Sequence, residues 1–472
     1  MLTFTIDMDS KTPLYQQLYA FIKSEIQSGV ITYNTMLPSK RKLSAHLQIS
    51  QNTIQTAYDQ LIEEGYIVSL ERKGFYVSKI DNLIIMTNNQ VYKNINNAIV
   101  TDENKKTKAL YDFSYDDVDI ESFPIKIWRK LTKDAINEYD KEIFQPGESQ
   151  GHISLRKSIA EYLHQSRGVK CSADQIIISA GAEFLFQILF QLFDKNKIYG
   201  VENPGYEKLN LLFSSNRAQF KPIDIDEEGM VPEAVIKSKA NILCITPAHQ
   251  FPSGEIMPIN RRIQLLNWAY TGDKYNERYI IEDDYDSEFK YSGKPIPALQ
   301  GLDYNDKVIY MGNFSKSLSP SIRVSYMVLP SHLVKAYLRK LPFIICPVPV
   351  ISQKVLFRFI RDGYFERHLN RMRNIYKRKR EVLVKSIKDL NCAIKVLGAD
   401  TGLHLLLQID NKMAEEQLVS SALLSGVKVY GVSKYYLDNA NDGSLPKILI
   451  GFAAIKEEEI KKAVKLLKTA WF

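Results

Sequence analysis

The sequence has few cysteines and no long apolar run. Its 472 residues include only Cys171, Cys244, Cys346 and Cys392, whose wide spacing excludes a zinc motif or a disulfide framework. The first residues lack the basic and apolar segments of a signal peptide, and no apolar run approaches the roughly 20 residues that span a bilayer. We therefore expect a cytoplasmic protein without a membrane partner.

Residues 1–80, the candidate nucleic-acid-binding region, carry little excess positive charge. The whole chain carries a formal net charge of +8, but residues 1–80 hold eight Lys and Arg against seven Asp and Glu. A DNA-binding role must therefore rest on where the charges lie rather than on their sum. The length exceeds what one hydrophobic core supports, so we expect two or three domains.

Residues 1–80 show the order helix, helix, turn, helix and hairpin. Thr12 can cap a first helix with Pro13 in its first turn, a second helix begins near Ser39, and Ser50 can cap a third. Gly65 ends the third helix, and "YIVSLERKGFYVS" indicates two short strands. This order is typical of a winged helix-turn-helix domain.

In such a domain the third helix presents polar side chains to base edges in the major groove, and nearby cations contact phosphates. The expected DNA-binding residues are Ser50, Gln51, Asn52, Thr53 and Gln55 on the helix, with Lys40, Arg41, Arg72 and Lys73 for phosphates. A small helical domain that binds another protein is the alternative interpretation.

The segment "LPSKRKLSAHLQISQNTIQTAYDQLIEEGYIVSLERKGFYV" resembles the DNA-binding domain of GntR-type bacterial regulators almost end to end. The resemblance implies binding to double-stranded operator DNA. That family usually has Ser-Arg at the start of the recognition helix, where this chain has Ser50-Gln51. Arginine reads guanine bidentately, whereas glutamine suits adenine, so this position affects operator preference.

Residues 81–110 are rich in Asn and Lys without sustained periodicity, which predicts an irregular linker. From residue 111 onward, short apolar strands such as "QIIISA", "NILCITP", "RYIIEDD" and "KVIYMG" alternate with amphipathic helices. This pattern predicts an α/β domain with a mainly parallel sheet. Ligands in such folds bind beyond the carboxyl ends of the strands.

Four polar groups follow these strands. "ISAGAEFLFQ" offers a helix N-terminus to a phosphate, and "ITPAHQFPSG" places His249 in a loop. "IIEDDYDSEF" crowds carboxylates, which suggests a cation site, a solvated loop, or one carboxylate holding a protonated heterocyclic nitrogen; no metal site is expected. "GNFSKSLSPSIRVSY" carries Lys316 and Arg323 among hydroxyl groups.

Lys316 has three interpretations: a surface lysine, a partner in a Ser-Lys nucleophile, or a Schiff-base lysine. The ordered set of phosphate turn, oxygen-binding loop, carboxylate, lysine and arginine favours the last, because together they supply what pyridoxal 5′-phosphate needs.

This set resembles fold-type-I aminotransferases, and so do "FPIKIWRKL", "QPGESQGHISLRKSIAEYL" and "ENPGY". The resemblance covers residues 111–472, with a smaller α+β subdomain from about residue 345. It implies that Lys316 forms the Schiff base, Asp283 pairs with the pyridine nitrogen, Tyr285 approaches the ring hydroxyl and Tyr206 stacks on the ring. The other implied cofactor-binding residues are Ala182, Glu183, His249, Asn313, Ser315 and Arg323.

A GntR-type reader, a linker and an aminotransferase-like domain together resemble the MocR/GabR subfamily of bacterial regulators. The resemblance implies a head-to-tail homodimer that responds to an amino compound. The arginine that holds a substrate carboxylate is replaced by Leu449, which leaves Lys208 and Lys434 as candidate effector-binding residues. Two alternatives stay open: a working aminotransferase that binds DNA, and a sensor of pyridoxal phosphate itself.

Overall fold

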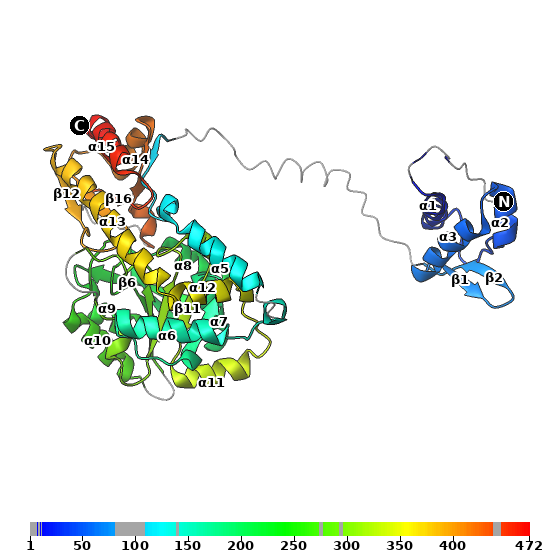
Figure 1. The fold of residues 1–472 in the computed structure, drawn as a ribbon, viewed down its shortest axis with the longest axis horizontal. Coiled ribbons are helices and arrows are strands. Elements are labelled where there is room, and N and C mark those ends of the chain that lie inside the picture. Colours follow the sequence, from blue (N-terminus) through cyan, green and yellow to red (C-terminus); the bar gives the residue numbers. More distant parts are fainter. Residues whose placement is uncertain are drawn as a thin grey trace. The chain divides into compact units, whose positions relative to one another are not determined.

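The structure is a computed structural model that describes residues 7, 10, 12–80, 109–137, 141–272, 277–291, 296–437 and 445–472. The chain divides into two compact units, Met1–Asn104 and Lys105–Phe472 (Figure 1). The linker predicted for residues 81–110 lies almost wholly outside the described residues. None of the helices in the described ranges combines the length and apolar character that a membrane crossing needs.

The first unit is a three-helix domain with a hairpin. Its elements are α1 (Leu14–Gln27), α2 (Lys40–Leu47), α3 (Gln51–Glu63), β1 (Ile67–Leu70) and β2 (Gly74–Val77). One apolar core joins all of them: Leu18 and Ile22 of α1 pack with Ile54 and Tyr58 of α3, and Val77 closes the hairpin side. The strands β1 and β2 pair antiparallel, as a wing requires.

Helix caps explain where these helices begin. The side chain of Ser39 accepts the backbone N–H of Lys42 at the start of α2, and Ser50 accepts that of Thr53 at 3.1 Å at the start of α3. The cap expected from Thr12 is wrong. Pro13 itself takes the N-cap position of α1, so Thr12 lies one residue too early in the chain.

The second unit is built on an eight-stranded sheet in the order β4-β11-β10-β9-β8-β5-β6-β7. The strands are β4 (Ile176–Ser179), β5 (Ile198–Asn203), β6 (Gln219–Asp226), β7 (Gly229–Met230), β8 (Ile242–Ile245), β9 (Tyr279–Asp284), β10 (Val308–Asn313) and β11 (Ser325–Val328). The pairs from β10 to β6 are parallel, whereas β11 is antiparallel to both neighbours and β7 to β6. The carboxyl ends of β4, β5, β8, β9 and β10 therefore share one edge.

Helices cover both faces of this sheet (Figure 1). They are α5 (Ile125–Asn137), α6 (Ile153–Arg167), α7 (Ala182–Leu192), α8 (Glu207–Ser215), α9 (Pro232–Ser238), α10 (Ile259–Tyr270), α11 (Ser331–Lys340) and α12 (Val350–Arg361). Alternation along β9 shows the two layers: Ile281 packs in the cluster formed by α7, α8 and α11, and Ile280 in the cluster formed by α9 and α10. The inner strands β8 and β9 are buried on both faces and begin with apolar residues, whereas β6 carries polar residues at its exposed positions.

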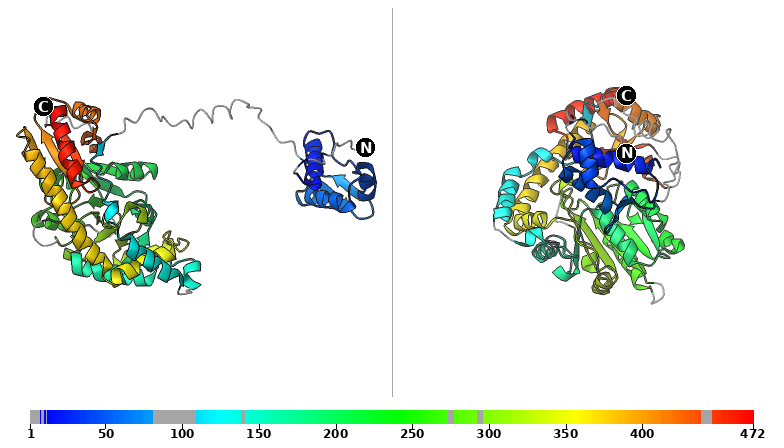
Figure 2. Two further views of the ribbon diagram at one scale, coloured as in Figure 1. Left: turned by 45° about the horizontal axis from the view of Figure 1, so that its top comes forward. Right: turned by 90° about the vertical axis from the view of Figure 1, so that its right-hand side faces the viewer.

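A smaller antiparallel sheet in the order β12-β13-β16-β15 forms the C-terminal part. Its elements are α13 (Tyr364–Lys388), β12 (Ile394–Leu397), β13 (His404–Ile409), α14 (Glu415–Leu424), β14 (Val427–Lys428), β15 (Tyr430–Gly431), β16 (Lys447–Gly451) and α15 (Glu457–Trp471). The long helix α13 runs from α12 to this part (Figure 2). The strand β3 (Tyr111–Asp112) pairs with β14, so the start of the second unit joins its end.

The subdomain boundary expected near residue 345 precedes α12, and α12 packs on α5 and α6 of the larger part. Short 3-10 helices complete the unit: η1 (Ile120–Ser122), η2 (Lys141–Phe144), η3 (Ala173–Gln175), η4 (Gln300–Leu302), η5 (Pro320–Ile322) and η6 (Ser433–Tyr435).

Candidate functional site

A cavity of about 300 Å³ opens at the edge where the parallel strands end. Segments that follow β4, β5, β8, β9 and β10 contribute to its walls, and so do the residues after β3 and the first residue of β13. Of the predicted cofactor-binding residues, those that line the cavity are Ala182, Glu183, Tyr206, Asp283, Tyr285, Asn313, Ser315, Lys316 and Arg323. The fold therefore brings together segments that lie more than 100 residues apart.

Lys316 lies just beyond β10, and its Nζ donates a hydrogen bond to the carbonyl oxygen of Tyr115 at 2.7 Å. Its side chain is 15% exposed, and Asp116 Oδ1 is 3.9 Å from Nζ. Burial lowers the pKa of Lys316, and the carboxylate of Asp116 opposes this shift only in part. A lysine that loses its proton more easily is a better nucleophile toward a carbonyl group.

The crowded carboxylates of β9 separate into different roles because side chains alternate along a strand. Glu282 points into the protein and accepts the backbone N–H groups of Leu299 and Gln300. Asp284 pairs with buried Arg167 at 2.8 Å, which makes it a structural ion pair. Asp283, between them, lines the cavity.

Asp283 has no hydrogen bond or ion pair within the described part of the chain. Burial, followed by the neighbouring charge of Asp284, raises the pKa of the Asp283 carboxyl to about 7. A buried carboxylate without a partner is costly, and a protonated ring nitrogen is a partner that would relieve this cost. The unpaired Asp283 carboxylate in the cavity therefore fits the pyridine ring of pyridoxal phosphate.

The other end of the cavity fits a phosphate. Helix α7 begins at Ala182 after Gly181, whose φ of +117° favours glycine, and the first N–H groups of the helix border the cavity. Arg323 Nη2 lies here and bonds Glu183 Oε2 at 2.9 Å. A Cβ on Gly181 would lie 2.2 Å from that Nη2, so a larger residue there would displace the guanidinium. Ser315 borders the same space.

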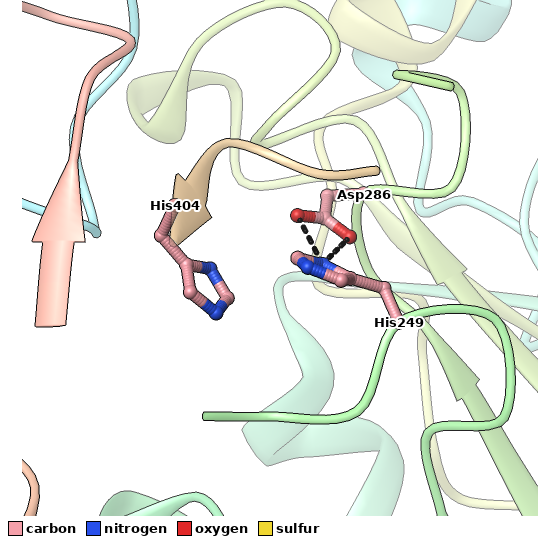
Figure 3. A group of neighbouring side chains, drawn as sticks. All are labelled: His249, Asp286 and His404. Carbon is pink, nitrogen blue, oxygen red and sulfur yellow. Dashed lines mark hydrogen bonds and ion pairs between the residues drawn. The ribbon is translucent and has the colours of Figure 1, made fainter. Parts of the chain in front are cut away.

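His249 does not line the cavity but contacts residues that do. Its Nδ1 lies 2.9 Å from Asp286 Oδ1 (Figure 3). The hydroxyl of Tyr285 lies 3.0 Å from the same nitrogen. The ring of His404, on β13, is 4.6 Å from the His249 ring. Burial lowers the pKa of His404 to about 3, so this imidazole is neutral.

The predicted effector residues differ in position. Lys208 lines the cavity, and its Nζ lies 3.2 Å from Asp116 Oδ2. Lys434 is exposed and does not line the cavity; its ammonium lies 4.9 Å from the ring centroid of Tyr435. Tyr206 borders the cavity and packs edge-on against Phe251 at 5.5 Å.

Leu449 on β16 is fully buried in a small apolar cluster with Phe251, Leu406, Val432 and Tyr435. Phe251 also lines the cavity, so the cluster backs one of its walls. The part of the cavity wall that this cluster backs is therefore apolar and aromatic.

Sequence reasoning missed several cavity residues. Tyr115, Asp116 and Asp117 come from the loop after β3, and His404 comes from the C-terminal sheet. They approach Lys316 only through the packing of the two parts of the unit. No short pattern in their own segments carries that information.

The predicted DNA-binding residues cluster on and around α3. Gln51 and Asn52 are exposed and have no side-chain partner among the residues that the structure describes. Ser50 and Thr53 bond each other at 2.8 Å, and Gln55 Nε2 donates to Asp59 Oδ1 while its Oε1 accepts from Lys40. Arg41, Arg72 and Lys73 are exposed. Gln51 and Asn52 are thus the side chains that remain free for base edges.

Two family descriptions match the chain. Residues 112–467 match aminotransferase class I and II, and residues 14–77 match bacterial regulatory proteins of the gntR family. The uncharacterized HTH-type transcriptional regulator YdeL of Bacillus subtilis is 41% identical over 97% of this chain and 97% of its own. The probable rhizopine catabolism regulatory protein MocR of Rhizobium meliloti is 29% identical over 99% and 95%.

The fold of the larger unit is that of pyridoxal-phosphate aminotransferases. The crystal structure of Pyrococcus horikoshii kynurenine aminotransferase superposes with a TM-score of 0.68 and 23% identity, and covers 82% of this chain and 95% of that one. At this identity the likeness concerns the fold alone.

Proposed function

Since the chain belongs to the MocR/GabR subfamily of GntR-type bacterial transcriptional regulators, we propose that it binds pyridoxal phosphate at Lys316 and senses an amino compound there. The sensor acts on operator DNA bound by α3 and the hairpin. The observation that carries this proposal is the buried Lys316 in a cavity whose two ends suit a pyridine ring and a phosphate.

Each residue has a defined task in this proposal. When bound, pyridoxal phosphate supplies an aldehyde that reacts reversibly with primary amines. Asp283 holds the ring nitrogen, and Tyr285 approaches the ring hydroxyl. The N-terminus of α7, Ser315 and Arg323 hold the phosphate. Asn313 supports this loop because its Oδ1 accepts the backbone N–H of Ser315 at 2.9 Å.

The amino effector enters beside Lys316. Lys208 is the cavity cation available to an acidic group on the effector, although Asp116 competes for it at 3.2 Å. Phe251 and Tyr206 offer an apolar surface to the rest of the molecule. Lys434 stays a candidate for the rim of the cavity.

Regulation follows if the C-terminal sheet can pack in two arrangements and the effector binds them with different affinities. The population then shifts toward the better-bound arrangement, and the DNA-binding domains respond. We propose that the protein acts as a head-to-tail homodimer that presents two such domains to the operator.

The test uses the purified full-length protein incubated with pyridoxal phosphate and a panel of amino compounds. Visible absorbance reports the cofactor, and a gel-shift assay reports DNA binding. We expect Lys316→Ala to lose both the absorbance and the effector response, whereas the exposed control Lys195→Ala keeps both. An effector response that survives in Lys316→Ala would refute the proposal.

A working aminotransferase is the second candidate, because Lys316 and Asp283 both line the cavity. Lysine holds a carboxylate as a point charge without the two-pronged geometry of arginine, and loose positioning of a substrate costs rate. We therefore expect little product from an amino donor and a keto acid. Sustained turnover would support the enzyme instead.

Pyridoxal phosphate itself is the third candidate signal. A relative in Corynebacterium glutamicum, named as the HTH-type pyridoxine biosynthesis transcriptional regulator PdxR, is 28% identical over 98% of this chain. In that case DNA affinity would depend on the cofactor without any amino compound.

A further inference from the structure

An Asp–His pair lies at the cavity wall, with Asp286 among the lining residues and His249 behind it. His249 and Asp286 are 2% and 1% exposed, and the two carboxylate oxygens lie 2.9 and 3.0 Å from the same imidazole nitrogen, Nδ1 (Figure 3). His249 follows β8 and Asp286 follows β9, so two adjacent parallel strands hold the pair. Tyr285, next to Asp286 in sequence, lines the cavity.

The carboxylate is held in one orientation. The backbone N–H of Leu403 donates to Asp286 Oδ2 at 3.2 Å. Gly402 has a φ of +71°, and a Cβ there would lie 1.9 Å from His249 Cε1 and 2.6 Å from Asp286 Oδ2. The entry to β13 thus packs closely on the pair and leaves room only for glycine.

The donors and acceptors of these groups decide where the protons lie. A carboxylate can only accept, so His249 Nδ1 must carry a hydrogen to bond Asp286. The Tyr285 hydroxyl lies 3.0 Å from that same nitrogen, but it cannot donate to a nitrogen that already bears a hydrogen. Its own proton must therefore point elsewhere, and the cavity is the space that Tyr285 borders.

We infer that Asp286 is a positioning residue: through the imidazole of His249 it directs the O–H of Tyr285 into the cavity as a hydrogen-bond donor. The inference rests on the proposed binding of pyridoxal phosphate, whose ring oxygen is the acceptor. Burial, followed by the charges of Asp286 and Asp283, raises the pKa of Tyr285, which keeps this donor protonated.

A metal ion is the competing interpretation of the same side chains. Ligand atoms of His249, Asp286 and His404 lie within 4.8 Å of one another. The direct contact of Asp286 with Nδ1 at 2.9 Å favours the hydrogen-bonded pair, because a metal would occupy both atoms. His404 Nε2 is also already 3.3 Å from the carbonyl oxygen of Pro252.

The main experiment follows the absorbance of the bound cofactor as a function of pH. A donor to the ring oxygen stabilises its negative charge, so loss of the donor raises the midpoint. The amide of Asp286→Asn carries no charge and no longer holds the hydrogen on Nδ1, so the tautomer with an unprotonated Nδ1 can accept the proton of Tyr285 instead. We expect Asp286→Asn and Tyr285→Phe each to raise the midpoint by a similar amount, and the double variant to raise it no further.

The direction of the midpoint change separates this role from a simple effect of charge. Removing a nearby negative charge would by itself lower the midpoint. The titratable groups that surround His249 and Tyr285, besides Asp286, are Glu202, Glu255, Asp283, Asp284, Lys316 and His404. Asp117→Asn is the matched control, since this exposed carboxylate lines the same cavity without contacting the pair. We expect no rise in the control.

Three results would overturn the inference. The first is a lowered pH midpoint in Asp286→Asn, and the second is a midpoint in the double variant that equals the sum of the two single changes. The third is a pH dependence of the absorbance that a chelator abolishes and zinc restores. If no variant folds, ¹⁵N NMR of the histidines in the unaltered protein still decides, because the inference requires a protonated Nδ1 on His249. Normal cofactor absorbance with a lowered midpoint would refute only this role. Absence of the absorbance would refute the proposed function as well.

Discussion

The DNA-binding face and the cofactor cavity are built in opposite ways. The face takes its base-reading candidates, Gln51 and Asn52, from the first turn of one helix, where both are exposed. The cavity takes Asp283 from β9 and Lys316 and Arg323 from the connection between β10 and β11, and buried pairs such as Asp284 with Arg167 support these segments. A change on the face should therefore act locally, whereas a change in the cavity should spread through its partners.

The largest effect should come from Asp284→Ala, behind the cavity. Removing this carboxylate leaves Arg167, which is 3% exposed, as an unpaired buried charge. We expect the unfolding free energy of the second unit to fall by about 3–5 kcal/mol. Urea denaturation measures the change, with exposed Asp117→Ala expected to cost less than about 0.5 kcal/mol. A similar loss of unfolding free energy in both variants would show that the buried Asp284 carboxylate contributes no more to stability than the exposed Asp117 carboxylate.

Asp283→Asn should weaken the cofactor site without unfolding it. The variant loses the charge that holds the ring nitrogen, a contact worth about 1.5–3 kcal/mol. We therefore expect the dissociation constant of pyridoxal phosphate, measured by absorbance titration, to rise about 10- to 100-fold. Binding to non-specific DNA should stay unchanged. Unchanged cofactor affinity would show that Asp283 does not contact the ring.

Gln51→Ala should affect only the face. Loss of one base contact costs about 1–3 kcal/mol at the operator, with the discrimination at that base pair relaxed. Lys73→Ala, by contrast, should weaken binding to all sequences and reduce the salt slope by about 1. Fluorescence anisotropy at several salt concentrations separates the two. Altered cofactor absorbance in Gln51→Ala would contradict the expectation that a change on the DNA-binding face acts only locally.

The last comparison concerns pH in cofactor-free protein. The Asp283 carboxyl, with its pKa raised to about 7, binds a proton more readily in the folded than in the unfolded chain. Its contribution to stability is thus present at low pH and is lost as pH rises toward 7. The amide of the Asp283→Asn variant does not titrate. The unfolding free energy of the variant relative to that of the unaltered protein should therefore rise between about pH 4 and pH 7. Urea denaturation across this range measures the gain, and a constant difference would contradict the raised pKa.

How much the sequence predicts also differs between the two regions. Ser39 and Ser50 cap α2 and α3 as expected, because a cap depends on the nearest few residues. The prediction for Thr12 is wrong because cap position is uncertain by one residue when a proline follows. In both regions the order of helices and strands followed from periodicity.

The cavity is only partly visible in the sequence. Strand alternation separates Asp283 from Asp284, but which of the two faces the cavity depends on how β9 lies in the sheet. Tyr115 reaches Lys316 across about 200 residues of chain, and His404 comes from the other sheet. Such contacts follow from tertiary packing, which no local pattern encodes.

Borohydride reduction of the protein incubated with pyridoxal phosphate, followed by peptide mass spectrometry, tests the central claim most directly. We predict one stable pyridoxyl-phosphate adduct, located on Lys316, that is lost when an effective amino compound competes. Unlabelled Lys316, or label spread evenly over exposed lysines, would contradict the account.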